Sequence, residues 1–163
     1  MQRSTMVPWL FKLVIVSGIV LAGSGLWGIF FTYQKVSQEK IITPEDASLS
    51  QVPVRGPFSL KAQAEVIREH TLSTTDGKTY AEMPRSVPKL DADGNVMVGV
   101  DGTPVMTANT ARDIWITATT LTTALYLAMF AYAFFGFMLI SGLILVIIGV
   151  ACHLSMKAKA TQM

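Results

Sequence analysis

The sequence has few of the residues that catalytic and metal-binding proteins depend on. Its 163 residues include one cysteine, Cys152, and two histidines, His70 and His153. A single cysteine excludes an internal disulfide and a multi-cysteine metal site. Only 15% of the residues are charged, against roughly 25% in a typical soluble domain. This deficit argues against an ordinary cytoplasmic enzyme, and the net charge of +2 is too small to favour a nucleic-acid partner.

Charge is absent above all from two long apolar segments. The first runs from Leu13 to Phe31 without a charged residue, and as a helix it would be about 28 Å long, close to the hydrocarbon thickness of a bilayer. A secretory signal peptide is the alternative, because Arg3 and Lys12 form a basic region before the segment. We favour a retained membrane helix over residues 13–33, because the segment is long and no small-residue cleavage site follows it.

Small residues gather on one side of this first helix. Gly18, Ala22 and Gly25 are spaced i, i+4 and i+7, which places them on one helical face. In lipid, small side chains let two helix backbones approach closely, and this packing replaces the missing hydrophobic drive. Glycine is also simply common in membrane helices. We interpret the stripe as a helix-packing face, for which the second helix of the same chain is one candidate partner.

The second apolar segment is longer than one membrane span needs. From Ile114 to Ala151 the sequence contains no charged residue and no proline, and a helix of that length would measure about 57 Å. Two spans would need a reversal, for which Gly136 alone is a poor signal. We therefore expect one helix over residues 114–152, with a span from about 126 to 152 and a threonine-rich part outside it. Trp115 combines a large apolar ring with one N–H donor, so we expect it to dock the outer segment or a partner subunit.

The distribution of charge predicts the topology. All eleven acidic residues lie between the two apolar segments, whereas the tails, residues 1–12 and 153–163, contain basic residues and no acidic ones. The positive-inside rule then makes both tails cytoplasmic and residues 34–113 extracytoplasmic. The opposite orientation would place four basic tail residues outside. We expect a multi-pass protein of a bacterial inner (plasma) membrane.

The central segment carries signals for a short helix and a small β structure. Thr43-Pro44-Glu45-Asp46 has the form of a helix start. Ser59 is placed to cap a second helix, from Leu60 to about Leu72. Two turn signals, Asp93-Gly94 and Asp101-Gly102, enclose alternating valines and predict a hairpin or a three-stranded meander. The expected fold class is a mainly α membrane protein, with two transmembrane helices and a central α+β outer segment.

No constellation of residues predicts catalysis. Asp91, Asp93 and Asn95 begin like a calcium loop, but glycine and glutamate are missing at positions 6 and 12 of such a loop, so we interpret them as a turn. His153 is more typical of an interfacial residue than of a haem or chlorophyll ligand. Cys152 is more typical of a small apolar residue than of a nucleophile, with palmitoylation as the alternative. We expect no enzyme activity, no metal and no cofactor.

Several short motifs nevertheless form a recognisable set: Gly56-Pro57-Phe58, Gln63-Ala64, Gly77 to Met83, Ala111 to Thr117 and Leu121 to Leu125. They resemble a group of small two-span bacterial membrane proteins of actinobacterial type, some of which are labelled ring-opening dioxygenases. The resemblance implies the two-span topology. It does not extend to that chemistry, because two histidines at opposite ends of the predicted topology cannot share an iron site with a carboxylate.

These observations together predict a non-catalytic accessory or structural subunit of a larger membrane protein complex. A respiratory or photosynthetic energy-transducing complex is the specific form we expect. The partners would be other membrane protein subunits and the lipid bilayer, and not nucleic acid. The alternative is a self-associating membrane protein with an envelope or sensory role. Such a homo-oligomer would use the face of Gly18, Ala22 and Gly25.

Overall fold

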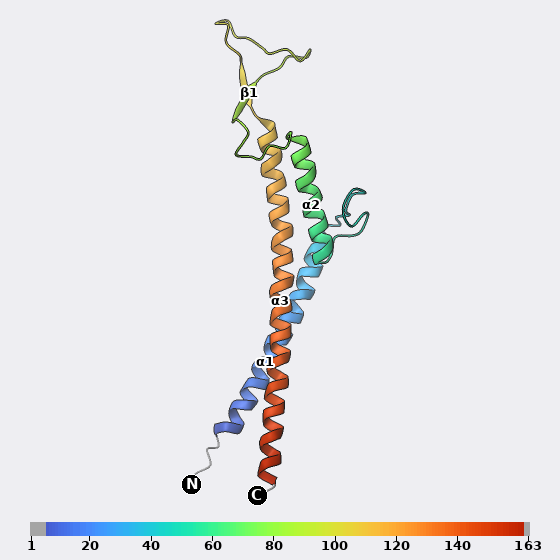
Figure 1. Cartoon of the computed structure of the whole chain (residues 1–163), viewed down its shortest axis with the longest axis vertical. Helices are drawn as coiled ribbons and strands as arrows, with labels where there is room; N and C mark the ends of the chain where they lie inside the picture. The colour runs from blue at the N-terminus through green and yellow to red at the C-terminus, as the bar shows by residue number, and fades with distance from the viewer. Residues whose placement is uncertain (1–5, 162–163) are drawn as a thin grey trace. The chain divides into compact units, whose positions relative to one another are not determined.

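The computed structural model describes residues 6–161 and consists mainly of helices (Figure 1). Its elements are α1 (Met6–Gln38), α2 (Pro57–Thr74), β1 (Ser86–Pro88), β2 (Met106–Ala108) and α3 (Thr110–Thr161). Arg3, one of the basic residues behind the predicted topology, lies outside the described residues. The chain divides into two compact units. The first contains α1, residues 53–57 and α3 from Leu127 onward, and the second contains residues 42–52 and 58–126.

The two long apolar helices both extend beyond their predicted bounds. α1 continues to Gln38, so most of the expected polar stalk is helical, because no proline or glycine interrupts the chain after Gly28 in this region. α3 is unbroken through Gly136, and its 52 residues correspond to about 78 Å. Asn109 caps α3, since its Oδ1 accepts the N–H of Ala111. Both helices are long and apolar enough to cross a membrane.

In the second unit, α2 is covered on two faces. The helix begins at Pro57, a residue favoured in the first turn, so Ser59 lies within the helix instead of capping it. Leu60, Ala64 and Thr71 are buried on one face, while Ala62 and Val66 are buried on the opposite one. The segment 42–52 belongs to the same unit, and Asp46 accepts a hydrogen bond from Nε2 of His70 on α2. This contact therefore ties the segment to α2 in a way that the sequence did not indicate.

The helix predicted at Thr43 is wrong, because the segment forms turns instead. The side chain of Thr43 is 1% exposed, and its Oγ1 donates to the carbonyl of Leu49 and accepts the N–H of Val52. A hydroxyl that bonds across a loop competes with the helix-capping geometry. Gln51 has a positive φ of 51°, which reverses the chain before Pro53. The Thr-Pro-Glu-Asp pattern thus closes a compact loop.

The β signals produce a small two-stranded sheet and two isolated β-bridges. β1 pairs antiparallel with β2, with Val87 opposite Thr107, and isolated bridges join Leu90 to Val96 and Val98 to Pro104. Gly94 and Gly102 adopt φ of 84° and 78° in the two turns, a conformation that glycine tolerates.

The carboxylate that resembled a calcium ligand serves one of these turns. Oδ1 of Asp91 accepts the backbone N–H groups of Asp93 and Asn95, as the turn interpretation predicts. Within residues 6–161 no group of three or more His, Cys, Asp or Glu side chains is placed to hold a metal ion.

Candidate functional site

Two glycines of α1 lie directly against the backbone of α3. A Cβ atom added to Gly18 would stand 2.7 Å from the carbonyl oxygen of Gly142, and one added to Gly25 would stand 2.5 Å from the backbone nitrogen of Leu139. Both distances are shorter than real Cβ contacts, so no other residue fits at either position without moving the helices apart. Close backbone approach of this kind is how small residues hold helices together in lipid.

The contact continues on both helices, and we call it the glycine seam. It also contains Ala22, because a Cβ on Gly142 would lie 2.8 Å from the Cα of Ala22. Gly28 lies under the ring of Phe135, and a Cβ on Gly149 would stand 2.6 Å from Cγ1 of Ile15. The predicted residues Gly18, Ala22 and Gly25 therefore line a contact within one chain. Because α3 covers this face of α1, the face is not free to bind a second copy of the chain, as the self-association alternative requires.

Sequence reasoning missed the α3 side of the glycine seam. Gly142 and Gly149 are seven residues apart, the same separation as Gly18 and Gly25. A seven-residue repeat keeps one face directed at a neighbouring helix over two turns. Matching the two glycine spacings would have identified the partner face from the sequence.

Trp115 joins the first part of α3 to the segment that follows α2, through hydrogen bonds to Thr75 and Lys78. Its side chain is 7% exposed, and its Nε1–H donates to the carbonyl of Lys78 at 2.7 Å and to Oγ1 of Thr75 at 3.2 Å. The guanidinium of Arg68 on α2 lies 5.8 Å from the ring centroid. Trp115 therefore binds a segment of its own chain, one of the two kinds of docking contact expected of it.

Arg112 makes a second attachment, which sequence reasoning did not select. Its Nη1 donates to the carbonyls of Met83 at 2.6 Å and Tyr80 at 3.2 Å, and its guanidinium lies 3.8 Å from the centre of the Tyr80 ring. Nδ2 of Asn109 donates to the carbonyl of Pro84. A cation is unfavourable in the first turn of a helix, so the position of Arg112 was itself a signal for a tertiary role.

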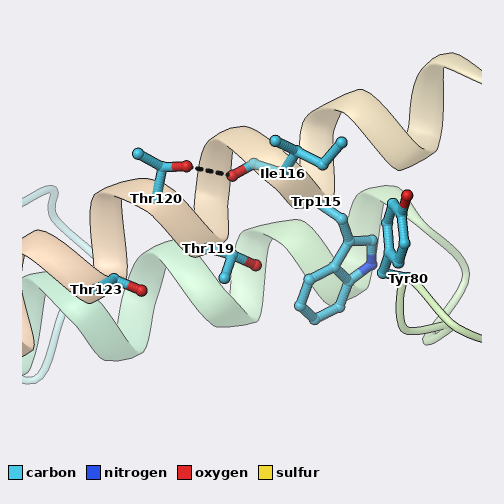
Figure 2. Close-up of a pocket in the computed structure, with 6 residues that line it drawn as sticks. All are labelled: Tyr80, Trp115, Ile116, Thr119, Thr120 and Thr123. Carbon is cyan, nitrogen blue, oxygen red and sulfur yellow. Dashed lines mark hydrogen bonds between the residues drawn. The ribbon is translucent and has the colours of Figure 1, made fainter.

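An open groove lies beside Trp115 on α3 (Figure 2). Its volume is about 490 Å³, and it is lined by Tyr80, Trp115, Ile116, Thr119, Thr120 and Thr123. The hydroxyl of Thr120 donates to the carbonyl of Ile116 at 2.9 Å, as the dashed line in Figure 2 shows. A threonine bonded to its own helix in this way presents its methyl group to the surroundings. The groove has no charged lining and is suited to an apolar protein surface.

Comparison of the chain with models of protein families, with curated proteins and with solved structures finds no match in any of the three.

Proposed function

We propose that this protein is a non-catalytic membrane subunit with two membrane-spanning helices and a small extracytoplasmic unit, and that this unit binds other membrane protein subunits. The observation that carries the proposal is the groove beside Trp115. It is apolar, uncharged and open, and it lies on a part of α3 that is already fixed by Trp115 and Arg112. A fixed apolar surface of this kind is typical of a protein-binding site.

Insertion of α1 and α3 into a membrane is supported by the surface that the glycine seam leaves uncovered. Ile19, Val20, Trp27, Ile140 and Ile147 are all more than half exposed. Soluble monomers rarely expose contiguous apolar patches beyond a few hundred Å². Lipid is the natural cover for these side chains, and the backbone contact between the helices supplies their association there.

The outer boundary of the membrane is proposed from a contact of Tyr132. Its hydroxyl donates to the backbone carbonyl of Arg55, in the loop Pro53–Pro57 of the same unit. A loop that contains a charged residue belongs outside the hydrocarbon region. The span of α3 then begins near Tyr132, later than the expected start at Tyr126. About 20 residues from there to Cys152 suffice to cross a bilayer.

A role in binding, without catalysis, is proposed because the described side chains show no nucleophile beside a base. His70 is hydrogen-bonded to Asp46, and this exposed pair joins α2 to the loop 42–52. Cys152 is half-buried on α3. A respiratory or photosynthetic energy-transducing complex remains the first assembly that we propose to examine.

Purification from native membranes in a mild detergent, followed by mass spectrometry, tests the proposal. We expect other membrane subunits to co-purify with the wild-type chain and to be lost from Thr123→Lys, which puts a charge in the groove. Thr117→Lys is the matched control, because Thr117 is exposed on α3 but does not line this groove. Recovery of the wild-type chain without any other subunit would contradict the accessory role.

A further inference from the structure

Residues 86–108 form a small layer in which three antiparallel pairs of strands meet, and we call it the hairpin junction. One pair is β1 with β2, and the other two are the hairpins held by the isolated bridges, which spread apart beyond β1 in Figure 1. Three backbone hydrogen bonds of 2.7, 2.8 and 2.8 Å close a cycle where the pairs meet: the N–H of Lys89 donates to the carbonyl of Val105, that of Val105 to Met97, and that of Met97 to Lys89. This cycle holds the three pairs in one layer, because each central residue bonds to both of the others.

The register of the hairpin junction places six apolar side chains on one face. Directly paired residues of an antiparallel sheet lie on the same face, and so do residues i and i+2 of one strand. The residues before and after each central residue are paired with those of the neighbouring strands, so this relation can be followed through all three pairs back to its start. The six side chains, which we call the apolar face, belong to Pro88, Leu90, Val96, Val98, Pro104 and Met106.

Within residues 6–161 nothing covers the apolar face. Leu90, Val98 and Met106 are 55%, 60% and 54% exposed, and Pro88 and Pro104 are exposed as well. An antiparallel sheet that faces water on one side normally packs its apolar side on a core, and two-stranded hairpins need such packing for stability. An apolar face that is built by regular alternation and left open therefore marks an interaction site.

The border of the apolar face is acidic. The hairpin junction contains four charged residues, of which Asp91, Asp93 and Asp101 lie at the two turns, whereas Lys89 lies on the opposite face by the same alternation. The N–H and the hydroxyl of Thr103 both donate to Asp101, and these hydrogen bonds hold the pKa of its carboxyl below the ordinary value. The border is therefore negatively charged at neutral pH.

We propose that the apolar face is the docking surface for a partner protein whose own apolar contact region is bordered by lysine or arginine. Opposite charges around an interface favour one partner and suppress others, while the apolar centre supplies affinity. A second copy of this chain would bring two acidic borders together, and anionic lipid headgroups would be repelled in the same way. The apolar face shares no residue with the groove beside Trp115, so it adds a second contact to the function proposed above and does not depend on the first.

Photo-cross-linking of the full-length chain in intact cells tests this docking surface. A photoreactive phenylalanine analogue replaces either Val98 on the apolar face or Thr107, which is exposed on the opposite face because it is paired with Val87. We expect a covalent product with one other protein that is several-fold more abundant from Val98 than from Thr107. The cross-linked peptide of the partner should lie beside lysine or arginine residues.

Charge reversal at the border tests the complementarity of charge. In the chain with the photoreactive residue at Val98, Asp93→Lys should reduce the product about fivefold, because repulsion between exposed charges replaces attraction. Asp93 suits this change because the carboxylate of Asp91 shapes the turn. Thr107→Lys is the matched control, because it adds positive charge on the opposite face. Protection of the amides in the hydrogen-bond cycle from exchange should be equal in these variants, so that a lost product reports lost binding.

The same experiment can overturn the proposal. Equal products from Val98 and Thr107, or no product from either, would show that the apolar face binds no protein. A product of twice the chain mass with peptides of this chain alone would assign the face to a second copy, and a phospholipid adduct would assign it to a membrane surface. A product that Asp93→Lys leaves unchanged would exclude the basic border. None of these results bears on the groove, which the Thr123→Lys variant tests separately.

Discussion

At the scale of single residues, the protein depends on a few positions where a side chain is either forbidden or indispensable. Gly18 and Gly25 have no room for a Cβ atom, so their role is to let two backbones meet. Trp115 has the opposite role, because its ring fills space and its Nε1–H donates to the carbonyl of Lys78 and to Oγ1 of Thr75. Both kinds of position can be tested by single substitutions.

Substitution of Gly25 by Leu should weaken the hairpin. The new side chain would meet the backbone of Leu139, and overpacking of this kind costs about 1–3 kcal/mol. Thermal unfolding of the chain in detergent measures the effect. Gly23→Leu is the control, because no other described atom lies within 4 Å of a Cβ built there. Equal losses at Gly23 and Gly25 would contradict the glycine seam.

Two substitutions of Trp115 should separate its packing from its hydrogen bond. Trp115→Ala removes a buried ring, which typically costs about 3–5 kcal/mol. Trp115→Phe keeps most of the buried ring but loses the hydrogen bond to the Lys78 carbonyl, which should lower the stability by about 1 kcal/mol. The rate of protease cleavage between Thr75 and Arg85 reports the release of this segment. Cleavage should be fastest in Trp115→Ala, slower in Trp115→Phe and slowest in the wild type. Unchanged cleavage in Trp115→Ala would show that the indole does not hold the segment.

At the scale of elements, the second unit depends on the helical continuity of its part of α3, residues 110–126. Its buried positions, Trp115, Ala118 and Leu125, follow one face, so a break between them would turn part of that face away. The loop 42–52 is a smaller element, and the pair of Asp46 and His70 ties it to α2.

Thr119→Pro should break α3 within the second unit. Proline removes a backbone hydrogen bond and clashes with the preceding turn, at a cost of about 3 kcal/mol or more. Hydrogen exchange of residues 110–126 should accelerate, while Thr119→Ala, which keeps the helix, should leave the exchange slow. Slow exchange in the proline variant would mean that the helix accommodates a kink at this point.

Acidification should loosen the loop 42–52 from α2. The hydrogen bond from His70 holds the pKa of the Asp46 carboxyl below its ordinary value. A lowered pKa means that the contribution is present above the pKa of the unfolded chain, about 3.9, and is lost as the pH falls through the lower folded value. Protection of residues 42–52 from hydrogen exchange, taken relative to an unstructured chain at the same pH, should fall below about pH 4 in the wild type. Asp46→Asn should remove this pH dependence, and an unchanged dependence would assign it to another group.

At the scale of the whole molecule, the proposed arrangement is a two-span hairpin with both ends in the cytoplasm. All acidic residues lie between the two uncharged apolar segments, residues 13–31 and 114–151, and β1 and β2 belong to that central part of the chain. An alkaline phosphatase fused at Gly94 should therefore be active, whereas the same reporter fused at the C-terminus should be inactive. The reason is that alkaline phosphatase folds into its active form only outside the cytoplasm. Activity at the C-terminus would reverse the proposed topology.

The sequence by itself determined the features that depend on local composition and periodicity. Uncharged runs define the two long apolar helices, and Asp-Gly pairs define the turns at Gly94 and Gly102. The spacing of Gly18 and Gly25 identifies a face with no side-chain bulk. These signals are readable because hydrophobic burial, helix propensity and turn conformation act between residues that are near one another in the chain.

The tertiary structure decided which surface meets which. Only the fold places Gly142 against Gly18, the carbonyl of Lys78 against Trp115, and the ring of Tyr80 under Arg112. The side chain of Thr43, which resembled a helix cap, instead closes a loop, because its hydroxyl donates to the Leu49 carbonyl and accepts the Val52 N–H. Some of these pairings join residues more than a hundred positions apart in the sequence. Their free energy depends on the packing of whole elements against one another, which no local sequence pattern specifies.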